Sequence, residues 1–279
     1  MNHCLCFIGT YTRPLNHVHG RATGIHSVRL CLETGALTGL TVSEPVDNTS
    51  YLCSDSTGDR LHAISEITGW HGTPDGCITT FAIAGNSLRK LSQSSSRGRG
   101  PAYIRLDHSG RWLLCANYLE GNAAIFPVRD NGTLAQPTQT IPFTGGGPDP
   151  SRQQSPHPHA IVPTPDNRFV HIIDLGTDLI TGHRFDHRTG TLTRDPALDH
   201  HCGPGKGPRH FLHHPTTRTA YCVLELSSEV QTCRQLPVTR PRLPALPQLK
   251  RRIQPPAPHT LPPLRRKPHL PRQFHHAIP

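Results

Sequence analysis

The chain of 279 residues carries a formal net charge of +10, but this excess is confined to its C-terminal end. Residues 1–230 hold 19 Lys and Arg against 19 Asp and Glu, whereas residues 231–279 hold 10 Lys and Arg and no acid. The neutral first part is long enough to bury a sizeable core, and its charge gives no reason to expect a nucleic-acid partner. No stretch has the length and apolar character of a membrane span, so we expect no membrane association.

The elements predicted along the chain are short strands. Residues 5–12 predict one strand, and residues 24–32 alternate between apolar and polar side chains as a second strand would. The same order then returns: a turn, an apolar strand, a glycine-bearing turn, an alternating strand and a glycine hairpin. The predicted strand pairs are 61–67 with 76–83, 112–118 with 122–128, and 169–175 with 179–185. Residues 219–226 begin a fourth pair, for which we expect no partner strand.

Two short marks recur at a spacing of about fifty residues. The first is Asp or Pro, a turn and then Arg; its arginines are 51, 57 and 50 residues apart, at Arg60, Arg111, Arg168 and Arg218. The second is a glycine hairpin that leads to a leucine, at Gly35, Gly85, Gly132 and Gly190. A period of this size, built from strands and turns, is typical of propeller blades. We therefore predict an all-β fold, with about four blades of a β-propeller in residues 1–230.

The nine cysteines favour a reduced protein. Their number is odd and no pair has Cys-x-x-Cys spacing, which argues against a zinc or redox site. The N-terminus lacks the basic segment and long apolar run of a signal peptide. We therefore expect a cytoplasmic location.

Two segments depart from the repeat and carry residues suited to catalysis. They are Pro156-His157-Pro158-His159 and Gly207-Pro208-Arg209-His210, which occupy equivalent places in consecutive units. A propeller would bring them side by side near the mouth of its channel. Glu225 ends the predicted inner strand of the fourth unit, and Asn117 and Asp174 occupy comparable strand ends in the units before it.

These residue types suit the hydrolysis of an activated ester with an anionic substituent. Arginine can bind a carboxylate or phosphate or stabilise an oxyanion, and histidine can activate water. No Gly-x-Ser-x-Gly motif is present, which favours direct attack by water over an acyl-enzyme. Other interpretations stay open: His157 and His159 could bind a metal, Arg209 could bridge two blades, and Glu225 could simply face water.

Several motifs, in sequence order, resemble the lactonase family of seven-bladed propellers, which includes bacterial 6-phosphogluconolactonases. The resemblance covers about residues 5–230. It rests on Phe-Ile-Gly-Thr-Tyr-Thr at 7–12, Ala-Asn-Tyr at 116–118, Pro-His-Pro-His at 156–159, Asp-Leu-Gly-Thr-Asp at 174–178, Gly-Pro-Arg-His at 207–210 and Glu-Leu-Ser-Ser at 225–228. Leu224 departs from the family, which has Asn at that position.

The resemblance implies a reaction, a substrate and site residues. The reaction is hydrolysis of 6-phosphogluconolactone to 6-phosphogluconate in the pentose phosphate pathway, with a small anionic lactone as the partner and with neither a metal nor an organic cofactor. The predicted catalytic residues are His157, His159, Arg209 and Glu225; the predicted substrate-binding residues are Asn117, Asp174 and His210. A fungal relative on the same scaffold is a carboxymuconate cyclase, so a lactonising cyclase is the alternative activity.

Residues 231–279 differ abruptly from the rest of the chain. They hold 12 of the 29 prolines and no glycine. We predict either a disordered basic arm or a shift of reading frame near Val230, beyond which the family's remaining blades are expected. With a genuine tail the ring would stay open and expose strand edges, so a non-catalytic propeller fragment is a third interpretation.

Overall fold

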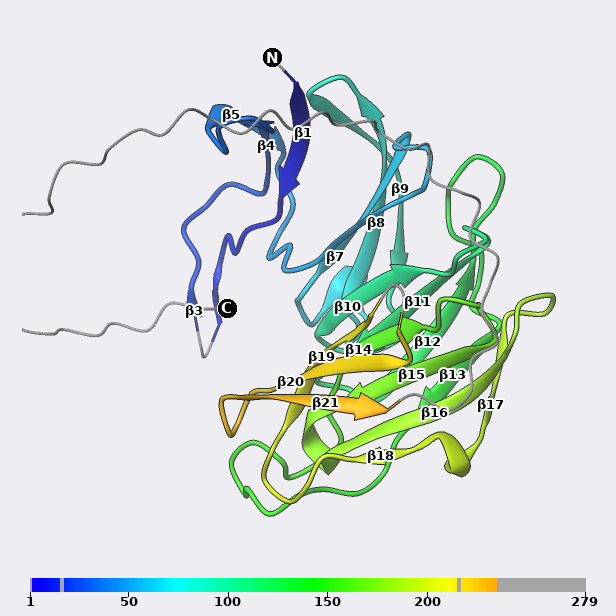
Figure 1. Cartoon of the computed structure of the whole chain (residues 1–279). Helices are drawn as coiled ribbons and strands as arrows, with labels where there is room; N and C mark the ends of the chain where they lie inside the picture. The colour runs from blue at the N-terminus through cyan, green and yellow to red at the C-terminus, as the bar shows by residue number, and fades with distance from the viewer. Residues whose placement is uncertain (1, 16–17, 215–216, 235–279) are drawn as a thin grey trace, which may run out of the picture. The chain divides into compact units, whose positions relative to one another are not determined.

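The computed structural model describes residues 2–15, 18–214 and 217–234, all within the unit Met1–Arg240. These residues form short antiparallel strands that make five consecutive sheets, each following the last along the chain (Figure 1). Among the described residues, no helix is long and apolar enough to cross a membrane. The fold is therefore all-β, as predicted.

Each sheet is a meander in which consecutive strands are neighbours. The first contains β1 (His3–Ile8), β4 (Ile25–Cys31) and β5 (Leu37–Glu44), and a ribbon of β2 (Pro14–Leu15) and β3 (Val18–His19) lies between β1 and β4 in sequence. The second contains β6 (Leu52–Ser54), β7 (Arg60–Ser65), β8 (Cys77–Ala84) and β9 (Ser87–Ser95). The third contains β10 (Pro101–Leu106), β11 (Trp112–Asn117), β12 (Asn122–Pro127) and β13 (Gln139–Pro142).

The fourth sheet contains β14 (Pro158–Pro163), β15 (Phe169–Asp174), β16 (Leu179–Asp186) and β17 (Thr191–Arg194), and β18 (His200–His201) also pairs with β16. The fifth contains β19 (Pro208–His213), β20 (Thr219–Leu224) and β21 (Glu229–Arg234). In the described part of the chain, three single-turn 3₁₀ helices lie in connections, at Trp70–Gly72, Leu175–Thr177 and Pro196–Leu198. The first strands β6, β10, β14 and β19 contact one another in sequence order, as the inner strands of propeller blades do.

The repeated Asp-turn-Arg mark has a structural role in each sheet where it is complete. The carboxylate of Asp55 accepts the backbone N–H of Arg60, and Asp107 accepts that of Trp112, which closes the turn before the second strand. The arginine then reaches the next sheet: Arg60 donates to the carbonyl of Asn131, and Arg111 to that of His187. The repeat thus encodes both a turn and a tie between neighbouring sheets.

The glycine hairpins occur where the second mark predicts them. Gly35, Gly85, Gly132 and Gly190 all have positive φ angles, between 60° and 84°. Side chains with a Cβ rarely adopt this conformation, so glycine fits the turn between the last two strands of a sheet.

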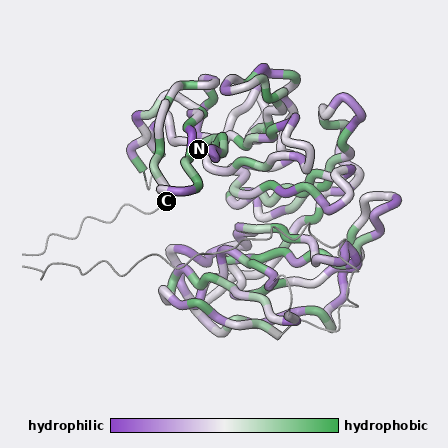
Figure 2. Tube along the Cα trace, turned by 45° about the horizontal axis from the view of Figure 1, so that its top comes forward, coloured by the Kyte–Doolittle hydropathy of each residue, from purple (hydrophilic) through white to green (hydrophobic). Residues whose placement is uncertain are grey.

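The core lies between the sheets. Ile25, Leu61 and Phe81 fill the space between the first and second sheets, and Ile64, Leu113 and Phe126 fill that between the second and third. A larger cluster joins the third, fourth and fifth sheets and includes Leu114, Ile172 and Phe211. Figure 2 shows the resulting pattern, in which hydrophobic stretches alternate with polar ones along the strands.

The first and fifth sheets leave one apolar face exposed. Leu37, Leu40 and Val42 on β5 are 60%, 64% and 51% exposed. In the fifth sheet, Leu212 pairs with Tyr221 and Val223 pairs with Val230, and all four side chains are exposed. Each of these faces thus lacks a covering sheet among the described residues.

Two details differ from the sequence-based expectations. The structure has five sheets where the repeat predicted about four, because the first sheet has no Asp-turn-Arg mark. The expectation that 219–226 lacks a partner strand is wrong, because β21 pairs with β20 from Glu229 to Arg234. The boundary predicted after Val230 falls inside β21, and the rest of the predicted tail, 235–279, lies outside the described residues.

Candidate functional site

The Pro-His-Pro-His segment enters β14 in an extended conformation. Proline fixes its own φ angle and disfavours helical geometry in the residue before it, so Pro158 holds His157 extended. The backbone N–H of His157 donates to Oδ1 of Asp174 at 2.6 Å, and the N–H of Gly176 donates to the same oxygen at 2.9 Å. Asp174 therefore positions the segment through the backbone of His157.

His157 is buried and fixed through its ring. Its Nδ1 lies 2.9 Å from the carbonyl oxygen of Tyr118, and the two rings stack with centroids 4.4 Å apart. A carbonyl oxygen can only accept a hydrogen bond, so Nδ1 carries a proton and donates it to this oxygen. Nε2 lies 3.5 Å from Oγ of Ser155.

His159 has a ring nitrogen without a hydrogen-bond partner in the described part of the chain. Its Nδ1 is buried and has no hydrogen-bond partner among the described residues. Burial, followed by the charge of Arg209 and the proximity of His210, lowers the pKa of His159 well below its usual value. The ring is therefore neutral at pH 7, with a lone pair available. It packs edge-on to Tyr118 at 5.6 Å and near His210 at 5.3 Å between centroids.

Glu225 forms the centre of an ionic cluster. Nη1 of Arg209 donates to Oε2 at 2.9 Å, and Nη2 of Arg152 donates to Oε1 at 2.5 Å. All three side chains are partly buried, with 23% of Glu225 and 27% of Arg209 exposed. The cluster therefore joins the connection before β14, which carries Arg152, to the fifth sheet, which carries the other two.

Arg152 is a site residue that the sequence reasoning missed. Burial opposes its charge, but hydrogen bonds to Tyr118 and Glu225 raise the pKa of the guanidinium. The only signal in the sequence is its position five residues before His157. Tyr118, which contacts Arg152, His157 and His159, was quoted within the Ala-Asn-Tyr motif but was not assigned to the site.

The structure brings together five of the seven predicted site residues. They are His157, His159, Arg209, His210 and Glu225. Asp174 supports this group through the backbone of His157. Asn117 is fully buried elsewhere in the third sheet, where its amide donates to the carbonyl of Ser96 at 2.9 Å and to Oδ1 of Asn122 at 2.7 Å.

Metal binding by the two histidines was left open by the sequence. Within residues 2–15, 18–214 and 217–234, no group of three or more His, Cys, Asp or Glu side chains is placed to hold a metal ion. His157 and His159 thus have no third ligand of these types in the described part of the chain.

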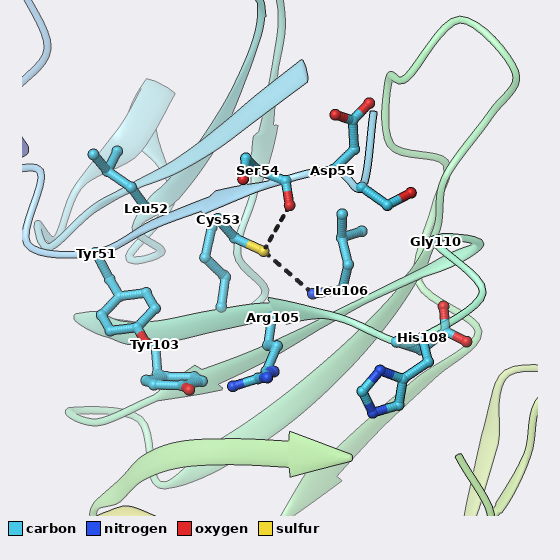
Figure 3. Close-up of a pocket in the computed structure, with 13 residues that line it drawn as sticks. Tyr51, Leu52, Cys53, Ser54, Asp55, Tyr103, Arg105, Leu106, His108 and Gly110 are labelled. Atoms are coloured by element: carbon cyan, nitrogen blue, oxygen red, sulfur yellow. Dashed lines mark hydrogen bonds between the residues drawn. The ribbon is translucent and has the colours of Figure 1, made fainter. Parts of the chain in front are cut away.

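A cavity of about 360 Å³ lies along the first strands of the second and third sheets, β6 and β10. Figure 3 shows the rings of Tyr51 and Tyr103 side by side at one end of it, with centroids 4.2 Å apart. These rings also lie 6.4 and 6.0 Å from that of His210. The cavity therefore adjoins the group of histidines.

Comparison with known proteins gives a consistent family. The family model described as "Lactonase, 7-bladed beta-propeller" matches residues 5–249. A 6-phosphogluconolactonase of Bacillus subtilis is 32% identical over 226 residues, which cover 80% of this chain and 60% of that protein. One of Formosa agariphila is 29% identical and covers 80% of this chain and 62% of its own.

A solved structure supports the same family. The periplasmic gluconolactonase of Pseudomonas aeruginosa has a TM-score of 0.74 and 29% identity, with 85% of this chain and 66% of that chain covered.

The chain spans only about 60% of the length of the Bacillus and Formosa relatives.

Proposed function

Because the chain belongs to the family of seven-bladed propeller lactonases, we propose that it hydrolyses a lactone, and that the lactone is 6-phosphogluconolactone. Two relatives named 6-phosphogluconolactonase support the choice of substrate. The product would be 6-phosphogluconate, and the partner a small anionic lactone. The reaction as proposed calls for no metal or organic cofactor.

One observation carries this proposal: a neutral, buried histidine lies near two arginines that share one carboxylate. His159 can accept a proton, while Arg209 and Arg152 supply positive charge in a partly buried setting. The hydrolysis of an ester needs both, because a proton leaves the attacking water as negative charge develops on the carbonyl oxygen. The described residues alone supply this proton acceptor and these positive charges, although the chain is shorter than its relatives.

In the proposed reaction, water attacks the lactone carbonyl and gives its proton to the imidazole of His159. The carbonyl oxygen becomes an oxyanion, which Arg209 stabilises. The electron pair on the oxyanion then re-forms the C=O bond as the ring C–O bond breaks, and the leaving alkoxide takes the proton from His159. The product is a hydroxy acid, whose carboxylic acid group releases its proton to the solvent, so the protein holds no extra proton after one turnover.

Glu225 serves in this scheme as a positioning residue. Each oxygen of Glu225 accepts a hydrogen bond from a guanidinium group, so both oxygens are engaged with arginine rather than with water. Its role is to fix Arg152 and Arg209 in place. His157 and Asp174 hold β14 in register, so they position His159.

The proposed substrate implies that the chain acts in the pentose phosphate pathway. It also leads us to propose a cytoplasmic location. The Pseudomonas relative is described as periplasmic, so location varies among proteins of this fold. Fractionation of cells that express the chain would test the location separately from the activity.

The activity is tested by adding freshly prepared 6-phosphogluconolactone to the purified chain and following acid release against a buffer blank. We expect a rate above the blank that increases in proportion to enzyme concentration. The variant His201→Gln, which changes an exposed histidine on β18, should have the same rate as the wild type. A rate equal to the blank would contradict the proposal. Turnover of carboxymuconate in place of the lactone would favour the cyclase alternative.

A further inference from the structure

The cavity along β6 and β10 contains one arginine near its centre, Arg105. Figure 3 shows Arg105 next to Tyr103, with His108 further along the same cavity. Arg105 lies two residues beyond Tyr103 on β10, and alternate residues of a strand share one side, about 7 Å apart. Arg105 therefore lies further along the cavity than Tyr103, on the side away from His210.

Arg105 differs from the other half-buried arginines in having no partner. Arg60 donates to the carbonyl oxygens of Asn131 and Asp59, and Arg152 and Arg209 both donate to Glu225. Within residues 2–15, 18–214 and 217–234, the side chain of Arg105 makes no hydrogen bond or ion pair. A half-buried guanidinium without a partner loses hydration and gains nothing in return.

The two carboxylates of the cavity are already engaged. Asp55 accepts from Thr57, Asp59 and Arg60 within its own turn. Asp107 has the corresponding role in the third sheet, where its oxygens accept from the backbone and hydroxyl of Ser109, from Trp112 and from Asn167. Both carboxylates thus shape the turns at the cavity rim and leave the guanidinium of Arg105 uncompensated.

The other titratable groups around Arg105 stay neutral. Burial, and then Tyr103, raise the pKa of Tyr51 above its usual range even though Arg105 opposes this shift. Burial, and then Arg105, lower the pKa of His108. On β19, burial, His171 and Arg105 lower the pKa of His213 to about 3. These neighbouring groups therefore supply no negative charge to pair with Arg105, so an anionic ligand could pair with it.

We propose that Arg105 binds a phosphate group, namely the phosphate of the substrate whose lactone carbonyl reacts at His159 and Arg209. This inference rests on the proposed function, since it assigns the remote end of that substrate. Arg152 and Arg209 are already paired with Glu225, whereas Arg105 has all its donors free among the described residues. The sugar would lie along the Tyr51 and Tyr103 rings, between the reacting carbonyl and the arginine. Arg105 thus determines specificity for a phosphorylated lactone.

The test compares two lactones that differ only in the phosphate. For wild type, Arg105→Gln and Arg105→Lys, kcat and KM are measured with 6-phosphogluconolactone and with gluconolactone. We expect Arg105→Gln to reduce the preference for the phosphorylated lactone, as a ratio of kcat/KM values, about 10- to 100-fold, mainly through KM. Arg105→Lys should restore part of the preference, because it keeps the charge but not the planar fork. Arg89→Gln, an exposed arginine on β9, should leave the ratio unchanged.

Calorimetric titration separates this inference from the proposed function. Wild type should bind 6-phosphogluconate, and Arg105→Gln should bind it at least tenfold more weakly, even if no lactone is turned over. Tighter binding of inorganic phosphate than of 6-phosphogluconate would mean that the subsite holds a free ion, and would overturn the assignment to the substrate. An unchanged specificity ratio in Arg105→Gln, or equal binding by variant and wild type, would overturn it as well.

Discussion

The fourth and fifth sheets share one strand order but differ in how their faces are covered. On β15, the consecutive residues Ile172 and Ile173 are both fully buried. On β20, Cys222 is fully buried, whereas its neighbours Tyr221 and Val223 are 38% and 44% exposed. Successive side chains of a strand point to opposite faces, so the fourth sheet is covered on both faces and the fifth on one.

This difference matters because the candidate site extends over both sheets. His157 and His159 belong to the well-packed fourth sheet, whereas Arg209 and Glu225 belong to the fifth. A blade buries both faces only when it has a neighbour on each side. We infer that packing of the fourth sheet determines the stability of the site. Packing of the fifth sheet determines how firmly the side chains of Arg209 and Glu225 are held in position.

The largest effect is expected from a cavity in the fourth sheet. Ile173→Ala should lower the free energy of unfolding by about 2–5 kcal/mol, because the residue is fully buried and its neighbours cannot close the space. Val223→Ala, on the exposed face of β20, should cost less than about 1 kcal/mol. Urea denaturation gives both values, and equal losses would contradict the comparison of the two sheets.

A drop in pH should destabilise the inner sheets through their buried histidines. Burial lowers the pKa of His62, on β7, from 6.5 to about 4. Below pH 6.5 the unfolded chain takes up a proton that the folded protein does not, so stability is retained above this pH and falls as pH decreases toward 4. At about pH 5, His62 alone should account for a loss of about 2 kcal/mol.

His62→Gln provides the matched test, because the amide can still bond to Thr80 and does not titrate. Urea denaturation at pH 7 and pH 5 should show a smaller difference for this variant than for the wild type. The exposed His201→Gln should keep the wild-type difference. An identical pH dependence in all three proteins would disprove the assignment to His62.

A smaller effect is expected from the charge cluster that joins the two sheets. Glu225→Gln should cost about 1 kcal/mol, because two arginines lose their shared carboxylate at a partly solvated site. Glu229→Gln breaks a single, more exposed pair with Lys206 and should cost almost nothing. Hydrogen exchange of β19 to β21 should be faster in the first variant only; equal rates in both would argue against a joining role for Glu225.

The smallest change in stability, within about 0.5 kcal/mol, is expected from Leu212→Thr combined with Val223→Thr. Both side chains lie on the exposed face of the fifth sheet. The double variant should nevertheless associate less in sedimentation velocity, because it removes apolar area from a face that nothing described covers. Unchanged association would show that this face is not where copies of the chain meet.

The repeat allowed most of the fold to be predicted from the sequence. Predicted pairs such as 112–118 with 122–128 correspond to β11 and β12, because period-two alternation and glycine turns depend on local chemistry. The partner of β20 was missed for the opposite reason. Residues 229–234 lie at a change in composition, and only pairing along β20 identifies them as a strand.

The candidate site was predicted less completely. His159 and Arg209 stand out because their segments depart from the repeat, and Glu225 stands out because it ends a predicted strand. Arg152 and Arg105 resemble surface arginines in the sequence, and their importance depends on contacts with residues up to 73 positions away, or on the absence of any partner. The amide of Asn117 bonds to Ser96 and Asn122 within the fold, and its role in substrate binding stays a prediction.

The measurement that tests the central claim most directly is the lactonase rate of His159→Gln, compared with that of His201→Gln at the same pH. The proposed role of His159 as proton acceptor predicts a loss of about 100-fold or more in kcat for the first variant, with wild-type folding by circular dichroism, and no loss for the second. Equal rates for the two folded variants would contradict the proposed site.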